Sequence, residues 1–355
     1  MGEGGDSPTV NQLRRLAERC KRPLSVFYLP EPPQDFQALR DFRRLPSARD
    51  RRFSPQLAYE VRAAYERRLV ALEVLSDLGE APAELGVTAV TKDNTELVAG
   101  RLRERLGLTV AQQVRFNDHF RGWRDAIEAG GVLVFVLSGA HHQVELEEMR
   151  GFAIAEKPLP VIVVNGKDRT PGKVFTLLHE LAHVALSQSA IENDVEAGDA
   201  LPEPDLIVER FCNRVAAAVL MPREAMLAEA IVVAKQQRQG PWNNEEILAF
   251  ARRYGVSREA LLLRLVELGR ADLAFYQAMR SEYARQREKA EEPETSGFAP
   301  YRYQVLGHLG RGFARLVLQG YHNNRLTLST ASGYLGVQAK YVPIIERAAF
   351  GMPAR

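Results

Sequence analysis

Cysteine is nearly absent from this chain of 355 residues, because it occurs only at Cys20 and Cys212, outside any Cys-x-x-Cys spacing. Two such cysteines cannot build a disulfide framework or an all-cysteine zinc site. Long apolar runs are missing too, since "GVLVFVL" and "PVIVV" are far shorter than the roughly 20 residues of a membrane-spanning helix. The first 20 residues lack the apolar core of a signal peptide. These absences favour a cytoplasmic protein with no membrane partner.

A large net charge of either sign is also missing. The chain has 47 Lys and Arg against 45 Asp and Glu, a formal charge of +2. This balance neither indicates nor excludes nucleic-acid binding, because any basic surface would be local. Arginines gather in "RDFRRLPSARDRR" (40–52), which is either a solvated loop or a phosphate contact. With 46% hydrophobic residues, the chain can bury a core, divided over two or three domains.

The spacing of the apolar residues predicts an α+β protein that is mainly α-helical and has a small sheet. Helices are expected over about 9–22, 54–78 and 95–106. "WRDAIEAGGVLVFVLS" predicts a helix, a glycine stop and a strand, and "RGFAIAEKPLPVIVVNGKD" predicts a pair of strands. Another helix should begin near Pro171 and run to about Leu186, and "DLIVERFCNRVAAAVLMP" predicts a second buried helix.

One apolar stretch, "FTLLHELAHVAL" (175–186), carries the polar side chains His179, Glu180 and His183. Residues four apart lie on the same face of a helix, so both imidazoles can bind one metal ion. Glu180 is offset by about 100° and can reach a water molecule at the metal. The alternative is a helix with two unrelated histidines. A helix that is apolar all round is buried, however, and a metal satisfies both buried histidines together.

A third protein ligand should lie farther along the chain. A metzincin would have a histidine where this chain has Ser189, so that class is excluded. Glu209 is the best candidate, because it starts the apolar "ERFCNRVAAAVL" and a buried carboxylate without a cation is costly. Arg210 and Arg214 could pair with it instead, and Asn213 is expected to support a ligand by a hydrogen bond. The other downstream carboxylates, most of them in a polar stretch typical of a solvated loop, are Glu192, Asp194, Glu196, Asp199, Glu203, Asp205 and Glu224.

His179, His183 and Glu209 are therefore the predicted metal ligands, and Glu180 the predicted general base for hydrolysis of a peptide bond. Zn²⁺ is the expected metal, and the same ligands accept Mn²⁺, Fe²⁺ or Co²⁺. "PVIVVNGKD", just before the metal helix, is either a strand that pairs with the substrate backbone or an ordinary buried strand.

The residue that stabilises the oxyanion is not singled out by any pattern. The candidates are His141, His142, Arg150 and Tyr254. Cys212, one turn from the third predicted ligand, is either an inhibitory thiolate or a small buried apolar side chain, and we favour the second interpretation.

"FTLLHELAHVAL" followed by "VERFCNRVAAAVLMP" resembles the ImmA/IrrE family of bacterial and prophage zinc metallopeptidases. "RGFAIAEKPLPVIVVNGKD" resembles the strands before the metal helix of that family, and the resemblance covers about residues 115–225. It implies a zincin-like fold in which His179, His183 and Glu209 bind zinc and Glu180 is the catalytic base. Family members typically cleave an XRE-type transcriptional repressor, which releases stress-response or mobile-element genes, so the resemblance also implies such a protein substrate.

The remaining regions are expected to be helical. "SPTVNQLRRLAERCKRPLSVFYLPEPP" resembles the end of an XRE-type helix-turn-helix domain and its linker, without the recognition helix. Residues 245–269 have the helix, short turn, helix rhythm of a helix-turn-helix. We therefore expect an N-terminal helical region, a zincin-like peptidase domain, a helix-turn-helix-like region and a C-terminal helical region, with the bounds 1–110, 111–235, 236–290 and 298–355.

Two other classes of function stay open. In the first, the chain is a DNA-binding regulator with a structural metal, which fits poorly because structural sites are closed and rich in cysteine. In the second, it is an antitoxin-like partner that holds a protein without cutting it. For a protease we expect selectivity for one or a few folded regulators over denatured casein, with the flanking helices as docking surfaces.

Overall fold

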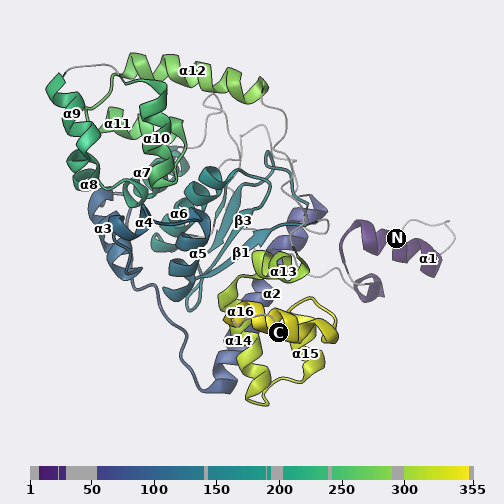
Figure 1. Ribbon diagram of the computed structural model, residues 1–355. Helices are drawn as coiled ribbons and strands as arrows, with labels where there is room; N and C mark the ends of the chain where they lie inside the picture. Colours follow the sequence, from purple (N-terminus) through teal and green to yellow (C-terminus); the bar gives the residue numbers. More distant parts are fainter. Residues whose placement is uncertain are drawn as a thin grey trace.

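The computed structural model of the protein describes residues 8–22, 24–28, 54–139, 143–188, 190–192, 203–238, 242–289 and 300–351. These residues form an α+β fold that is mainly helical and is built around one small mixed sheet, as the sequence predicts (Figure 1). His141 and His142 lie outside the described residues.

The sheet has the strand order β1-β3-β2-β4. Its strands are β1 (Leu133–Leu137), β2 (Gly151–Ile154), β3 (Val161–Asn165) and β4 (Ala190–Glu192). β1 runs parallel to β3, whereas β2 is antiparallel to both β3 and β4. β1, β2 and β3 are buried along their whole length, which explains why they read as continuous apolar runs rather than as an alternating pattern.

β3 is an interior strand. It pairs with β1 on one side and with β2 on the other, so its backbone hydrogen-bonding groups are already used. The interpretation of "PVIVVNGKD" as the strand that pairs with a substrate is therefore wrong, and the ordinary buried strand is confirmed. An extended substrate needs the open edge of a sheet, which this position does not offer.

The two faces of the sheet enter two different cores, because successive side chains of a strand point to opposite sides. Val134, Ile162 and Ala153 form a row across one face. Phe135, Val163 and Phe152 form a row across the other. We call the first the metal-helix face and the second the C-terminal face, after the helices that cover them.

The metal-helix face is covered by α6 (Thr170–Ala185), which lies against β2 and β3, and the predicted start near Pro171 is confirmed. The same core contains α3 (Thr95–Arg105), α5 (His119–Ala129), α7 (Glu203–Leu220), α10 (Asn244–Tyr254) and α11 (Arg258–Glu267). Short or peripheral elements on this side are α4 (Val110–Gln113), α8 (Arg223–Ala228), α9 (Ala230–Arg238) and α12 (Leu273–Lys289).

The helix pair α10–α11 confirms the predicted helix-turn-helix rhythm and shows what it packs against. Its apolar side chains, among them Phe250, Leu261 and Leu265, belong to the core that also holds α6. Arg264 of α11 is buried, where its Nε donates to the Met221 carbonyl at 3.0 Å and its Nη2 donates to Glu96 at 2.5 Å. These contacts tie α11 to α7 and α3, so the pair is part of the structural core.

The C-terminal face of the sheet is covered by α2 (Pro55–Leu78) together with α13 (Tyr301–Leu309), α14 (Arg311–His322), α15 (Leu328–Tyr334) and α16 (Val342–Phe350). Figure 1 shows the yellow C-terminal helices gathered beside α2, at the opposite end of the molecule from the green helices α9–α12. The short 3₁₀ helices are η1 (Leu24–Tyr28) and η2 (Ala339–Tyr341). The domain bounds expected from the sequence remain predictions. In the structure, α2 and α13–α16 share one core with the sheet.

The outer edge of β1 is occupied by side chains. Nη2 of Arg124 donates to the Val134 carbonyl, and Nδ1 of His308 donates to the Val136 carbonyl at 2.7 Å. Nη1 of Arg124 also donates to the Gly307 carbonyl at 2.6 Å, which ties α5 and β1 to α13. An edge strand whose carbonyls are satisfied in this way is protected against pairing with another strand.

Near the N-terminus, α1 (Val10–Arg19) confirms the first predicted helix. Thr9 and Gln12 form a capping box, in which each side chain bonds the backbone of the other residue. Most of α1 is exposed. Just after the end of α1, the Lys21 carbonyl accepts a hydrogen bond from Nη2 of Arg62 in α2 at 3.0 Å.

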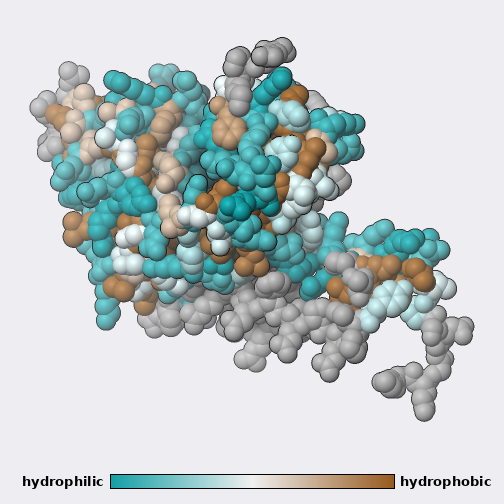
Figure 2. Space-filling view, turned by 90° about the horizontal axis from the view of Figure 1, so that it is seen from below, coloured by the Kyte–Doolittle hydropathy of each residue, from teal (hydrophilic) through white to brown (hydrophobic). Residues whose placement is uncertain are grey.

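No described helix is both long and apolar enough to cross a membrane. Figure 2 shows the face of the molecule seen from below, on which hydrophilic residues surround scattered apolar ones.

Deleting residues 298–355 should remove the cooperative unfolding of the whole protein, because α13–α16 bury one face of the sheet. Thermal unfolding followed by circular dichroism measures this. As a milder variant, Phe152→Ala empties a fully buried site on the same face and should lower the free energy of unfolding by about 3–5 kcal/mol. If the truncated chain unfolded at the same midpoint as the full chain, the C-terminal helices would be an independent unit.

Candidate metal centre

Two histidines of α6 meet one turn apart, as their spacing predicts. The Nε2 atoms of His179 and His183 are 3.0 Å apart, and both side chains are buried. Every residue of α6 from Val174 to Ala185 is buried, except Phe175. The two polar rings therefore belong to a buried, apolar helix. Buried polar groups need partners, and the two rings direct their Nε2 atoms to the same place.

Glu209 of α7 completes this cluster. Its Oε2 is 3.4 Å from Nε2 of His179, and its Oε1 is 3.3 Å from Nε2 of His183. Burial alone would raise the pKa of the Glu209 carboxyl, but the adjacent histidines outweigh burial and hold that pKa far below its ordinary value. The side chain is therefore a carboxylate, the form that binds a metal ion.

The donor set fits one divalent metal ion. Among the described residues, His179, His183 and Glu209 are a group whose ligand atoms all lie within 4.8 Å of one another. Bonds of about 2.0–2.2 Å to a tetrahedral ion place two ligand atoms about 3.3 Å apart. The observed separations of 3.0, 3.3 and 3.4 Å are close to this value. Two imidazoles and a carboxylate are also the ligand types that zinc and related ions prefer.

Asn213 lies where the sequence predicts, one turn after Glu209 on α7. Its Oδ1 is 2.9 Å from Nδ1 of His179. An amide oxygen can only accept, so the proton of this ring is on Nδ1 and the lone pair of Nε2 points into the cluster. Asn213 thus fixes both the tautomer and the orientation of one predicted ligand.

Part of this chain is similar to known proteins. The IrrE N-terminal-like domain family matches residues 128–266, from the end of α5 to α11. These residues are thus similar to an IrrE N-terminal-like domain, and we call them the IrrE-like domain. A curated relative, the radiation response metalloprotease IrrE of Deinococcus radiodurans, is 32% identical over 108 residues. The aligned stretch is 30% of this chain and 31% of the relative, so the chain spans about a third of the length of that protein.

Within the IrrE-like domain, α6 and α7 pack closely against each other. Val215, Ala216 and Ala218 of α7 share a core with Leu178 and Ala182 of α6. Small side chains allow two helices to approach closely, and this approach brings Glu209 to the histidines. Cys212 of α7 is fully buried in the same core, as expected for a small apolar side chain.

Glu180 is fully buried on α6, next to the first histidine. β2 of the IrrE-like domain lies against it at Gly151. A Cβ atom at position 151 would be 3.3 Å from Cγ of Glu180 and 2.5 Å from Cγ2 of Thr176. Gly151 therefore leaves space mainly for the Thr176 side chain of α6 and, less tightly, for that of Glu180. The sequence alone does not indicate this role, because a glycine that begins a strand is not informative until the facing helix is known.

Two of the proposed oxyanion residues have other partners in the IrrE-like domain. The Tyr254 hydroxyl donates to Oε1 of Glu229 at 2.7 Å, and the pKa of Tyr254 is raised by burial and by that carboxylate. Nη1 of Arg150 donates to Oδ2 of Asp168 at 3.2 Å. Neither contact brings the side chain to the metal cluster.

Proposed function

We propose that this protein is a zinc-dependent endopeptidase that cleaves a regulatory protein at one or a few sites. The observation that carries the proposal is the convergence of His179, His183 and Glu209 on one buried point, with Glu180 on the same helix. The family match over residues 128–266 supports a metallopeptidase with a divalent metal. Structural zinc sites are usually closed by four protein ligands, whereas three ligands leave a position for water or substrate.

Each residue of this cluster has its own role in the proposed hydrolysis of a peptide bond. His179, His183 and Glu209 would hold a divalent metal ion, which would supply Lewis acidity for the hydrolysis. Glu180 accepts the proton of the attacking water and then delivers it to the leaving amine, so the carboxylate is regenerated. Asn213 holds His179 in the tautomer that binds the metal. The complete burial of Glu180 limits competing water and strengthens its electrostatic interactions.

The substrate backbone needs an edge strand, and β4 is the better candidate. The edge formed by β1 already has its carbonyls bonded by Arg124 and His308. β4 pairs with β2 on its inner side, and in the described part of the chain no strand pairs with its outer side. It also comes soon after α6 in the sequence. We propose that an extended segment of the substrate adds to this edge.

A transcriptional regulator of the XRE type is the proposed substrate, and the cytoplasm the proposed location. The proposal is supported by the resemblance to the ImmA/IrrE family and by the relative named as a radiation response metalloprotease. Direct DNA binding through α10–α11 is not part of it, because Leu261, Leu262 and Leu265 of the second helix are buried in the core.

Cleavage of an XRE-type repressor encoded beside the gene tests the proposal. The full-length protein with Zn²⁺ should cut this repressor into a few defined fragments and leave denatured casein intact, because recognition needs contacts beyond the scissile bond. Gel electrophoresis and mass spectrometry of the fragments measure the outcome. Equal digestion of casein would contradict the regulatory role, and no cleavage of either protein would contradict the proposed function itself.

A further inference from the structure

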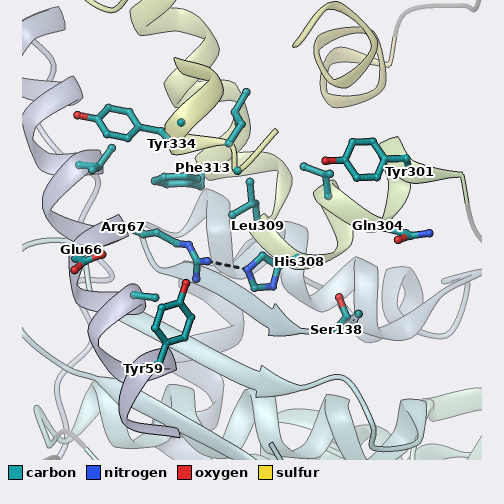
Figure 3. Close-up of a pocket in the computed structure, with 17 residues that line it drawn as sticks. Tyr59, Glu66, Arg67, Ser138, Tyr301, Gln304, His308, Leu309, Phe313 and Tyr334 are labelled. Atoms are coloured by element: carbon teal, nitrogen blue, oxygen red, sulfur yellow. Dashed lines mark hydrogen bonds between the residues drawn. The ribbon is translucent and has the colours of Figure 1, made fainter. Parts of the chain in front are cut away.

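A second site lies on the C-terminal face of the sheet, away from α6. It is a cavity of about 630 Å³, within the size range of small-molecule sites. Its walls come from α2, the end of β1, α13, α14 and the end of α15 (Figure 3). None of the predicted metal or catalytic residues lines it. We call it the Arg67 pocket, after the cation that lines it.

Arg67 is held in this pocket by a fixed chain of hydrogen bonds. The Val136 carbonyl of β1 can only accept, so Nδ1 of His308 carries the proton of that 2.7 Å bond. Nε2 of His308 is therefore an acceptor, and Nη2 of Arg67 donates to it at 2.9 Å. The guanidinium also lies 5.2 Å from the centre of the Phe135 ring. The sheet thus positions the Arg67 guanidinium through His308, and this guanidinium has further N–H groups that can donate hydrogen bonds.

The charge of Arg67 is not matched by a close carboxylate. Among the described residues no carboxylate forms an ion pair with this guanidinium, although the buried Glu60, Tyr59 and the exposed Glu66 each raise the pKa of Arg67. Arg67 is half-buried, and this burial lowers the pKa of its guanidinium from the ordinary value. Glu66 is exposed, so solvent screens its charge. An anion bound in the pocket would restore the interactions that the guanidinium lacks.

The rest of the pocket suits a flat apolar body. Val70, Leu309 and Phe313 supply apolar wall, and Tyr59, Tyr301 and Tyr334 supply aromatic surface. Figure 3 shows the Arg67 side chain reaching toward His308 between Tyr59 and Phe313. Ser138 and Gln304 are the remaining labelled polar side chains of the lining apart from Glu66. A few polar groups in an otherwise apolar cavity are typical of a site that orients one small ligand.

We propose that the Arg67 pocket binds a small organic anion, whose carboxylate or phosphate pairs with the Arg67 guanidinium while a flat apolar body fills the space between the tyrosines and Phe313. This site is distinct from the metal centre and does not depend on the peptidase function. Arg67 provides the charge recognition, and His308 positions it.

Isothermal titration of the full-length protein tests the proposal with three probes: 2-naphthoate, 2-naphthyl phosphate and the neutral 2-naphthamide. At least one of the two anions should bind about tenfold or more tightly than the amide. Arg67→Gln should abolish this preference, and the control Arg325→Gln, an exposed arginine outside the lining, should keep it. The stronger of the two anions tells a carboxylate ligand from a phosphate ligand.

A second variant tests the location and is expected to fold. Gly333 lines the pocket within α15, and a Cβ atom there meets nothing within 4 Å. Gly333→Leu should therefore lower the affinity for both anions and for the amide without lowering the thermal midpoint. No binding of either anion, equal binding of anions and amide, a preference that survives Arg67→Gln, or affinities unchanged in Gly333→Leu would each overturn the proposal.

Discussion

Glu180→Gln is expected to lower peptide hydrolysis by about 10²–10⁴-fold, because an amide cannot accept a proton from water. The metal content should stay at the wild-type value, since the cluster of His179, His183 and Glu209 does not include this side chain. Glutamine has nearly the same shape as glutamate, so it fits the space beside Gly151. The rate of cleavage of the repressor, or of a peptide containing its cut site, measures the effect.

The matched control for this variant is Glu147→Gln, which makes the same chemical change on an exposed side chain. Its rate should equal that of the wild type. If Glu180→Gln cut as fast as the wild type while retaining its metal, the assignment of Glu180 as the general base would be wrong.

His183→Ala is expected to reduce bound metal from one ion per chain to nearly none. The variant removes one of three converging ligand atoms and leaves Glu209 with a single histidine at 3.4 Å. Glu209→Ala should have the same effect, because it removes the charged ligand. Asn213→Ala keeps all three ligands and should weaken metal affinity by about 10–100-fold, since His179 loses the partner of its Nδ1. Elemental analysis after dialysis, and competition with a chelator for the Asn213 variant, measure these changes.

His322→Ala is the control for the loss of a histidine. His322 is 50% exposed and pairs with Glu346 at 2.6 Å, on helices that do not enter the metal cluster. Its metal content should match the wild type. Equal metal content in His183→Ala and the wild type would show that the ion, if present, is bound elsewhere.

The sequence by itself predicts how residues are arranged when they are close together along the chain. The spacing of His179 and His183 fixes them on one helix face, because a helix repeats every 3.6 residues wherever it lies. Local signals also predict where α1, α2 and α3 begin, because a side chain caps the N-terminus of each of these helices. The start of α6 is instead marked by Pro171 in its first turn. Glu209 was only one of several carboxylates, and it was selected from its apolar neighbours rather than from any contact.

Only the tertiary structure decided which segments meet. The packing of α7 on α6 brings Glu209 to 3.3 and 3.4 Å from the histidines and Asn213 to 2.9 Å from His179. Sheet order cannot be inferred from a strand that is buried on both faces, since its sequence does not specify its neighbours. For this reason the sequence of β3 is compatible with a substrate strand as well as with a buried one, although β1 and β2 enclose it.

The Arg67 pocket and the role of Gly151 are likewise products of tertiary packing. Arg67 and His308 are 241 positions apart, and β1 brings them together because its Val136 carbonyl binds the imidazole. Gly151 matters only because α6 crosses β2 at that residue. Periodicity and capping act over a few residues and can be read along the chain, whereas these contacts depend on which apolar faces bury one another.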